Sequence, residues 1–578
     1  MILKALYDYY NRSKESLPAF GRELKEIGFL IVIDKDGRFL RFEDRRVDKK
    51  QAQKFLVKKH IGRTCGIAAN LLYDNSGYVF GYSDKGDVTN QFMAFKEKVD
   101  GLFAKATSNA DLNAVHKFYA TDLMTLHHLM QEDPLWPEIA KNLNKKYSTF
   151  SFLIEGDTKI IAEKNELIEL DDNDSEDEGK HQICLVSGEQ GIPVETTTAT
   201  MIPGSQATAK LVAFQVNSGY DSYGKSKGSN APICEESEFA YTTALNHLLS
   251  SNSRNKFLIG TRTFLFWASK NDDAGQRAED CLFNLFGFSD QEDDPNKNIE
   301  QVRKVFKSIY TGELKTTSED TFYILGLAPN AARIAVTYWA EIPLKKFAET
   351  ICQHFEDMEV ADTRLDKKPY MSLRNILSAV TLGGKVPDAT PNLPDAVVKS
   401  IFQGLSYPQT LFASCIRRIR AESGEKDKNA VHITRAAIIK AYLNRLNDNQ
   451  QPIQVMLDKE NTNQGYLCGR LFAVLDKIQE EANNQHSIRE RYMNSASSTP
   501  AAVFSTILNL SNHHVENLKT ESRKVYFEKL KQEIVSKIDA DGFRPQLDLQ
   551  DQGRFFIGYY HQRQDFFTKN EGNNDEQY

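Results

Sequence analysis

Hydrophobic residues near the start of the chain come in short runs that are separated by turns. Residues 29–43, FLIVIDKDGRFLRFE, carry two runs of apolar, β-branched or aromatic residues on either side of DKDG. The Asp-Gly pair favours the positive φ angles of a tight hairpin turn, so this stretch predicts two antiparallel strands. Residues 65–85, CGIAANLLYDNSGYVFGYSDK, contain further short apolar runs around the DNSG turn. They predict a second pair of strands.

From about Pro343 onward the pattern changes, because apolar residues recur at the three- and four-residue intervals of a helix. Four such stripes near the C-terminus predict four amphipathic helices, and Thr499-Pro500 marks the start of the second. Helices of this kind bury their apolar stripes against one another in a bundle. The stripes consist of Leu467, Leu471, Val474, Ile478 and Ala482; Val503, Ile507, Leu510, His514 and Leu518; Phe527, Leu530, Ile534 and Ile538; and Phe556, Tyr559, Arg563 and Phe567.

These patterns predict an α+β fold in three parts. Residues 1–342 form a mixed α/β domain with an antiparallel sheet, residues 343–455 form a helical region, and residues 456–578 form a C-terminal helix bundle. With 578 residues, of which 40% are hydrophobic, the chain can form two or three domains with substantial cores. A purely disordered protein is therefore excluded.

The N-terminal residues lack the features of a secretory signal, and no apolar stretch reaches the length of a membrane helix. We therefore expect a soluble, cytoplasmic protein without a membrane partner. The seven cysteines include no C-x-x-C pair, and none has a histidine at zinc-ligand spacing. This pattern predicts reduced thiols rather than a metal site.

Charge is spread unevenly along a chain whose net charge is -7. Residues 35–63 contain eleven lysines and arginines but only four carboxylates, which fits either a nucleic-acid contact or a hairpin edge guarded by lysines. Residues 171–178, DDNDSEDE, have six carboxylates in eight positions and no apolar residue. We interpret this acidic stretch as a mobile, solvated surface loop, with a mimic of nucleic acid as the alternative.

Residues 219–226, GYDSYGKS, satisfy the phosphate-binding pattern G-x-x-x-x-G-K-[ST]. A working loop of this kind leaves a strand and enters a helix whose N-terminus points at the phosphates. The run KLVAFQV predicts a strand before the loop, but Gly228, Asn230 and Pro232 follow it, and the next helical pattern begins near Ser237. The one candidate for a metal-binding aspartate, Asp34, lies in the predicted hairpin turn. An ATPase is therefore not favoured.

The same loop suits the backbone of a nucleic acid better than a nucleotide. Its glycines let the backbone approach another surface, its lysines can bind phosphate, and asparagine amides can pair with base edges. Asparagines in the turn at residues 70–78 offer the same chemistry beside Gly77. The predicted DNA-binding residues are Asn70, Asn75, Asn217, Ser222, Tyr223, Gly224, Lys225, Lys227 and Asn230.

Two other interpretations of these residues stay open. Asparagine is a common turn residue, so Asn70 and Asn75 can serve the backbone alone, and a loop rich in glycine and serine can lack a ligand. The chain contains no H-E-x-x-H or G-x-S-x-G motif, and its paired histidines are adjacent residues, which point in different directions on a helix. We expect no enzymatic activity, cofactor or metal; a nucleotide hydrolase or a stand-alone nuclease is the alternative.

Four stretches closely resemble the large subunit of the type I-C CRISPR surveillance complex, Cascade, which is the Cas-eight-c family. The resemblance covers essentially the whole chain, and the acidic stretch at residues 171–178 looks like a local insertion. The stretches are FQVNSGYDSYGKSKGSNAPICEESEFAYTTALNHLL, GIAANLLYDNSGYVFGY, FYILGLAPNAARIAVTYW and YLCGRLFAVLDKIQEEAN.

The resemblance implies a non-enzymatic subunit of a crRNA-guided complex in antiviral defence. Such a subunit recognises the protospacer-adjacent motif in double-stranded DNA, helps to open the duplex and supports recruitment of the Cas-three nuclease-helicase. Its partners are subunits of the Cas-five and Cas-seven types and a small subunit. In this family the C-terminal helices are also made separately from an internal start, for which Met456 is the candidate here, although it can be an ordinary methionine. A purely structural subunit without DNA contact is a further alternative.

Overall fold

The structure, a computed structural model, forms two compact units. The N-terminal unit consists of Leu6–Thr198 and Phe214–Ala244, and the C-terminal unit consists of Met1–Ala5, Ala199–Ala213 and Leu245–Tyr578. The residues that the structure describes are 2–49, 51–61, 66–145, 147–172, 181–200, 202–214, 221, 223–250, 252–259, 261–285, 295–363, 372–390, 392–425, 429–446, 450–483 and 487–567.

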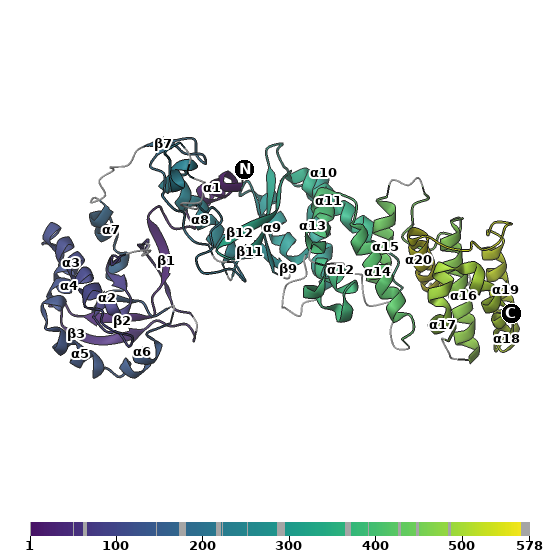
Figure 1. The fold of residues 1–578 in the computed structure, drawn as a ribbon, viewed down its shortest axis with the longest axis horizontal. Helices are drawn as coiled ribbons and strands as arrows, with labels where there is room; N and C mark the ends of the chain where they lie inside the picture. The colour runs from purple at the N-terminus through teal and green to yellow at the C-terminus, as the bar shows by residue number, and fades with distance from the viewer. Residues whose placement is uncertain are drawn as a thin grey trace. The chain divides into compact units, whose positions relative to one another are not determined.

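Figure 1 labels most of the helices and strands. Up to residue 249 they are α1 (Ile2–Arg12), β1 (Arg22–Glu26), β2 (Phe29–Ile33), β3 (Phe39–Asp44), β4 (Lys54–Lys58), β5 (Tyr73–Asp74), α2 (Ser76–Val79), α3 (Thr89–Lys105), α4 (Ala110–Ala120), α5 (Leu123–Gln131), α6 (Trp136–Asn142), β6 (Phe150–Ile154), η1 (Ile161–Glu163), α7 (Asn165–Asp172), β7 (Gln182–Ile183), β8 (Gln190–Gly191), η2 (Lys227–Asn230) and α8 (Glu235–Leu249). From residue 256 they are β9 (Lys256–Ile259), β10 (Arg262–Ala268), α9 (Asp273–Leu285), α10 (Pro295–Thr311), β11 (Thr321–Asn330), β12 (Arg333–Pro343), α11 (Leu344–Met358), α12 (Leu373–Ala379), η3 (Leu382–Gly384), η4 (Val386–Asp388), α13 (Leu393–Gln403), α14 (Gln409–Glu422), α15 (Ile433–Asn444), α16 (Gln464–Asn483), α17 (Ser487–Ser498), α18 (Pro500–Glu516), α19 (Glu521–Val535) and α20 (Leu549–Asp565).

The N-terminal unit is built on a four-stranded sheet in the order β3-β2-β6-β5. Strands β2 and β3 form the predicted antiparallel hairpin, and the side chain of Asp34 accepts hydrogen bonds from the backbone N–H groups of Asp36 and Arg38, both at 2.9 Å. The hairpin is therefore confirmed. On its other side β2 pairs with β6 in parallel, which the local pattern did not predict. All five residues of β2 are buried, and helices α4 and α5 pack against the sheet (Figure 1).

The second predicted strand pair is wrong. Only Tyr73 and Asp74 form a strand, β5, and the chain then turns into the one-turn helix α2. The reason is Asn75, whose Oδ1 accepts hydrogen bonds from the N–H groups of Gly77 at 3.0 Å and Tyr78 at 3.4 Å. The DNSG sequence therefore serves as the N-cap of a helix instead of the turn of a hairpin.

The C-terminal unit contains the antiparallel sheet β12-β11-β10-β9 and the helices that follow it. Strand β12 ends at Pro343 and α11 begins at Leu344, so the predicted change from strand to helix at about this proline is confirmed. Beyond residue 456 the described chain has five helices rather than four, because α17 lies between the first two predicted stripes. The hydrophobic pattern did not predict α17, because its buried side is short. The buried residues are Ile488, Met493, Ala496 and Ser497.

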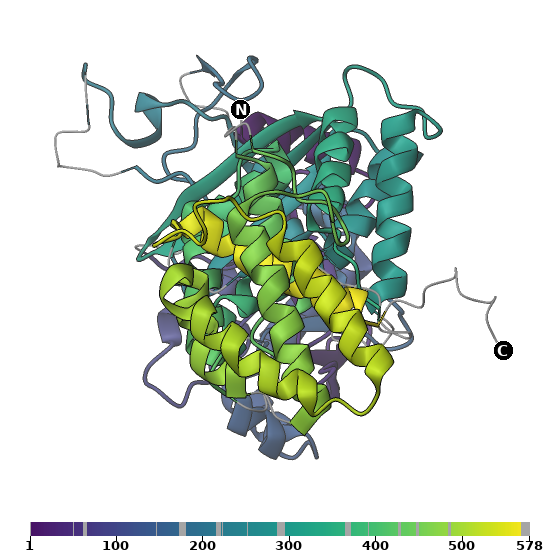
Figure 2. The ribbon, with the colours of Figure 1, turned by 90° about the vertical axis from the view of Figure 1, so that its right-hand side faces the viewer.

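Helices α16 and α20 lie side by side in the C-terminal group of helices (Figure 2). Two glycines make this close approach possible: a Cβ on Gly469 would lie 1.9 Å from the carbonyl oxygen of Phe555, and one on Gly558 would lie 2.3 Å from that of Tyr466. Helix α20 also packs against α15, so it is buried on nearly all sides. The predicted boundary at residue 455 therefore runs through a continuous core, and the separability of residues 456–578 stays a prediction.

Candidate nucleic-acid interface

The basic segment at residues 35–63 is partly neutralised by carboxylates from the same unit. Arg46 forms ion pairs with Asp44 at 2.6 Å and Glu138 at 2.8 Å. Lys58, at the end of β4, pairs with Asp171 at 2.8 Å and Asp172 at 2.7 Å. These two aspartates end helix α7; the rest of the predicted acidic loop, residues 173–178, lies outside the described residues. The sequence count thus overstates the positive charge that this segment offers to a ligand.

Some cations of the basic segment do remain available. In the part of the chain that the structure describes, four exposed side chains have no carboxylate within ion-pair distance, namely Lys35, Arg38, Lys49 and Lys54. Lys50 and Arg63 are not among the described residues. Lys59 pairs with Glu238 of α8 at 3.6 Å, which joins the end of the β1–β4 ribbon to the helix after the glycine-lysine loop.

Asn70 and Asn75 both line a cavity of about 320 Å³ at the end of the β1–β4 ribbon. Its wall consists of Lys25, His60, Ile61, Asn70, Tyr73, Asp74, Asn75 and Thr149. Asn75 also lines a neighbouring cavity of about 390 Å³, together with Ser83, Asp84, Lys85 and Asn144. The structure thus brings the two predicted asparagines to one concave surface.

The side-chain oxygens of both asparagines are used by the protein itself. Asn70 is 7% exposed, and its Oδ1 accepts a hydrogen bond from the N–H of Ile61 at 2.9 Å. The Oδ1 of Asn75 caps α2. Among the described residues neither Nδ2 group has an acceptor within hydrogen-bond distance. Each asparagine therefore combines a structural oxygen with an amide donor that a ligand can use.

Lys25 and His60 lie beside these donors, and both approach the carboxylate of Glu23. His60 Nδ1 lies 2.8 Å from Glu23 Oε2, and Lys25 Nζ lies 3.9 Å from Glu23 Oε1. Burial by itself would raise the pKa of Glu23, but the hydrogen bond and charge of His60 and the charge of Lys25 lower it. The carboxylate is thus held in its charged form and positions Lys25 and His60 beside the cavity.

The glycine-lysine loop is described only in part, because Asn217 and Ser222 lie outside the described residues. Tyr223 and Gly224 both have positive φ angles, of 53° and 70°, and the Tyr223 side chain is fully exposed. Lys225 is also exposed. Lys227 differs, because its Nζ lies 2.7 Å from Glu195 Oε2. Among the described residues of the loop, Tyr223 and Lys225 are therefore the aromatic and the cationic side chain most open to a partner.

Asn230 holds the loop together. Its Nδ2 donates to Asp221 Oδ1 at 3.2 Å and lies 3.3 Å from the carbonyl oxygens of Lys225 and Lys227. These contacts favour a turn-forming role for Asn230, which was expected to bind DNA. The Nδ2 donors of Asn230 are used for contacts inside the loop, so Asn230 is a poor candidate for reading bases.

The surroundings of the loop differ from those of a nucleotide-binding P-loop. The strand that KLVAFQV predicts does not form between residues 210 and 214, where the chain makes one isolated bridge, from Lys210 to Arg333. After Ser226 comes the 3₁₀ turn η2, and α8 begins only at Glu235. No helix N-terminus therefore faces the loop directly after the GKS residues, which a P-loop requires.

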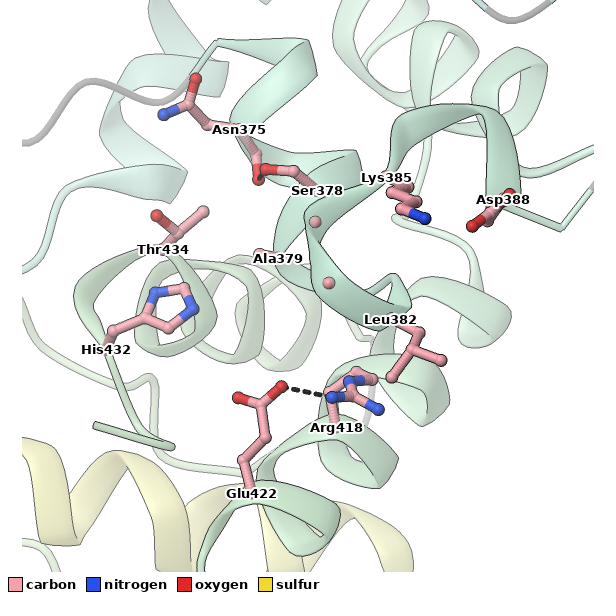
Figure 3. Close-up of a pocket in the computed structure, with 12 residues that line it drawn as sticks. Asn375, Ser378, Ala379, Leu382, Lys385, Asp388, Arg418, Glu422, His432 and Thr434 are labelled. Carbon is pink, nitrogen blue, oxygen red and sulfur yellow. Dashed lines mark hydrogen bonds and ion pairs between the residues drawn. The ribbon is translucent and has the colours of Figure 1, made fainter. Parts of the chain in front are cut away.

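Sequence reasoning missed a third cavity, of about 510 Å³, in the C-terminal unit (Figure 3). Asn375 and Ser378 of α12 form part of its wall, and Glu422 and Arg418 of α14 lie at the opposite end. Burial by itself would raise the pKa of Glu422, but hydrogen bonds from Arg435 and Arg418 lower it to about 2. The residues of this wall come from several helices and turns, so no local sequence motif predicts the cavity.

Two further properties of the described residues bear on other functions. They contain no group of three or more His, Cys, Asp or Glu side chains that could hold a metal ion. None of their helices combines the length and the apolar character that a membrane span requires.

Comparison with known proteins identifies the family. No curated protein matches the sequence. Residues 6–567, nearly the whole chain, match the family described as CRISPR-associated protein (Cas_Csd1). This match supports a Cascade-type subunit, which works in a crRNA-guided complex with other CRISPR-associated subunits. The chain therefore belongs to the Cas_Csd1 family of CRISPR-associated proteins.

Proposed function

We propose that this chain is the large subunit of a type I-C Cascade complex, of the Cas-eight-c family, and that it recognises the protospacer-adjacent motif in double-stranded DNA. It also aids opening of the duplex and supports recruitment of the Cas-three nuclease-helicase, without catalytic activity of its own. The observation that carries the proposal is the pair of amide donors, Asn70 Nδ2 and Asn75 Nδ2, on one cavity beside Lys25 and His60.

The chemistry of this cavity suits the edges of base pairs. Guanine N7 and O6, adenine N7 and thymine O4 are acceptors in the major groove, and adenine N3 and thymine O2 are acceptors in the minor groove. An asparagine whose Oδ1 is already occupied offers only its Nδ2 donors, so it selects acceptor atoms. Lys25 adds positive charge for the neighbouring phosphates. In a guided complex such a protein reads only the short motif, because base pairing to the guide reads the rest.

The glycine-lysine loop supplies a second, sequence-independent contact. Lys225 can neutralise a phosphate, and the exposed ring of Tyr223 can stack on a base that has left the duplex. Both groups are suited to holding DNA as it opens next to the motif. Subunits of the Cas-five and Cas-seven types, the small subunit and crRNA complete the proposed complex.

The decisive experiment separates the two roles of Asn75. Asn75→Asp keeps an oxygen that caps α2 but replaces the amide donor with an acceptor. The assembled complex is tested for binding to duplexes that carry all flanking trinucleotides. We expect the variant to lose discrimination at one position of the motif, by at most the roughly 1 to 3 kcal/mol that one mismatched base pair costs.

Asn109 provides the matched control, because its side chain caps α4 with the same geometry, accepting from the N–H groups of Asp111 and Leu112. Asn109→Asp should leave motif preference unchanged. Equal loss of binding on every flanking sequence by the Asn75 variant would refute base reading. ATP hydrolysis or DNA cleavage by the purified chain, abolished by Lys225→Ala, would instead favour the alternative of a nucleotide hydrolase or nuclease.

A further inference from the structure

Two cysteines that are far apart in the sequence meet in the N-terminal unit. Cys184 directly follows β7, and Cys234 directly precedes α8. The backbone N–H of Cys234 donates to Cys184 Sγ at 3.3 Å, and the Sγ of Cys234 lies 3.9 Å from the carbonyl oxygen of Gln182, two residues before Cys184. Both residues are buried and neither takes part in a disulfide. None of the DNA contacts proposed above involves them.

The backbone around the two thiols fixes their approach. The N–H of Leu185 donates to the carbonyl oxygen of Pro232 at 2.9 Å, and the N–H of Val194 donates to that of Ile233 at 3.0 Å. The chain leading into Cys234 is thus held by hydrogen bonds from both sides of the β7–β8 hairpin. A Cβ on Gly191 would lie 2.9 Å from Cys234 Sγ, so the hairpin needs glycine there to admit the sulfur.

The environment of the two thiols divides their chemical roles. Burial by itself would raise the pKa of Cys184, but four hydrogen bonds, from the backbone of Cys234, Ser187 and Val186 and the side chain of Ser237, lower it to about 6. Burial, followed by the charge of Cys184, raises the pKa of Cys234 to about 12. The first cysteine is therefore a thiolate at neutral pH and the second is a thiol, as in a nucleophile with its resolving partner.

We propose that Cys184 and Cys234 are a redox pair that a peroxide converts into a reversible intrachain disulfide. The thiolate sulfur of Cys184 attacks one peroxide oxygen, the O–O bond breaks, and the departing hydroxide takes up a proton to become water. Cys184 is then a sulfenic acid. The sulfur of Cys234 attacks it, the S–S bond forms, and the second oxygen leaves as water with the proton of Cys234. Two thiols and one peroxide give one disulfide and two waters.

The second step is helped by the first. Part of the rise in the pKa of Cys234 comes from the negative charge of Cys184, and that charge disappears when Cys184 becomes a neutral sulfenic acid. Cys234 then loses its proton more readily, which favours attack on the neighbouring sulfur. The other described cysteines lack such activation, because burial raises the pKa of Cys281, Cys352, Cys415 and Cys468.

The disulfide would also brace the glycine-lysine loop. Residues 192–194 pair with the chain at Cys234, and the next residue, Glu195, accepts a hydrogen bond from the N–H of Gly228 at 3.1 Å and pairs with Lys227. A covalent bond at Cys184 would thus tie the base of this loop to the β7–β8 hairpin.

The test is peptide mapping of the full-length protein after treatment with hydrogen peroxide. Trypsin releases Cys184 in the peptide 181–210 and Cys234 in the peptide 228–254, each with a single cysteine. We expect the two peptides to be joined by a disulfide that dithiothreitol reverses, with the loss of two of the seven thiols. Recovery of both peptides with free thiols, under conditions that oxidise another cysteine of the chain, would overturn the proposal.

Two variants distinguish the partners. Cys234→Ser leaves Cys184 without a resolving thiol, so a sulfenic acid should accumulate there and react with dimedone. Cys281→Ser is the matched control and should form the 184–234 link as the native chain does. If Cys234→Ser shows no dimedone adduct while the native protein forms no link, Cys184 is not a reactive thiolate and the proposal fails.

Discussion

Arg435 Nη1 lies 2.5 Å from Glu422 Oε2 in the core of the C-terminal unit. Arg435 is 3% exposed, and it also donates to the carbonyl oxygens of Ala379 and Ala430, each at 2.8 Å. Arg418 holds the other oxygen of Glu422. The pair thus fastens α14 to α15 and to the end of α12 beside the cavity in Figure 3.

Replacing Glu422 by Gln should destabilise the protein strongly. The change leaves the buried guanidinium of Arg435 without its counter-charge, which costs roughly 3 to 5 kcal/mol of unfolding free energy. Chemical denaturation followed by circular dichroism measures the loss. Glu349→Gln is the control, since Glu349 pairs with Lys346 on an exposed surface and such pairs contribute about 1 kcal/mol or less. Similar losses for both variants would contradict the importance of the buried pair.

Acid should destabilise the C-terminal unit through two buried histidines. Burial lowers the pKa values of His354 and His561 from 6.5 to about 3. A depressed pKa means that the unfolded state binds the proton first, so this stability is present above pH 6.5 and is lost as the pH falls from 6.5 towards 3. Each histidine should contribute a slope of about 1.4 kcal/mol per pH unit in that window.

His561→Gln tests the second histidine directly. Between pH 6 and 4 the unfolding free energy of the variant should fall less steeply than that of the native protein. The difference should be about 1.4 kcal/mol per pH unit, the contribution of one proton. An identical slope for native protein and His561→Gln would show that His561 does not titrate on unfolding as expected.

Local chemistry in the sequence located the hairpin at Asp34 and the change to helix after Pro343, because turn and helix signals act over a few residues. The same signals failed at Asn75, since an asparagine followed by serine and glycine can serve either a hairpin or a helix cap. The pairing of strands that are distant in the sequence could not be predicted. Strand β6 pairs with β2 from more than a hundred residues away, and the local sequence of neither strand specifies its partner. For the same reason the sequence could not show that Glu195 neutralises Lys227 or that Asn230 is occupied within its loop.

Lys225 and Lys227, which the sequence pattern treats alike, should differ in DNA binding. Lys225 is exposed, whereas Lys227 pairs with Glu195, so only the first should add a full phosphate contact. For the assembled complex, Lys225→Ala should flatten the salt dependence of binding by about 0.9 in log-log slope, equally for all target sequences. Lys227→Ala should change that slope less. Unchanged slopes for both variants would indicate that the loop does not touch DNA and would favour a purely structural role.

Residues 456–578 should fold as a separate helical unit and join the assembled complex. Helices α16 to α19 pack on one another, and α20 passes beside α16 along the close contacts at Gly469 and Gly558. Removing α14 and α15 uncovers one side of α20, where Gly553 normally packs on Phe412 of α14 and Ile439 of α15, so the fragment should be helical and cooperative but less stable than in the full chain. Thermal unfolding followed by circular dichroism tests this.

Two further variants make the prediction sharp. Leu471→Asp buries a charge at a fully enclosed position and should abolish folding of the fragment, whereas Leu510→Asp, at a side chain that is 37% exposed, should be tolerated.

Met456 is itself 64% exposed and precedes α16, so Met456→Leu can remove an internal start without disturbing the core. In the full gene this change should eliminate a small copurifying band. A band that persists would place the start elsewhere, and a fragment that is unfolded although the full chain is stable would show that α20 depends on α14 and α15 for its folding.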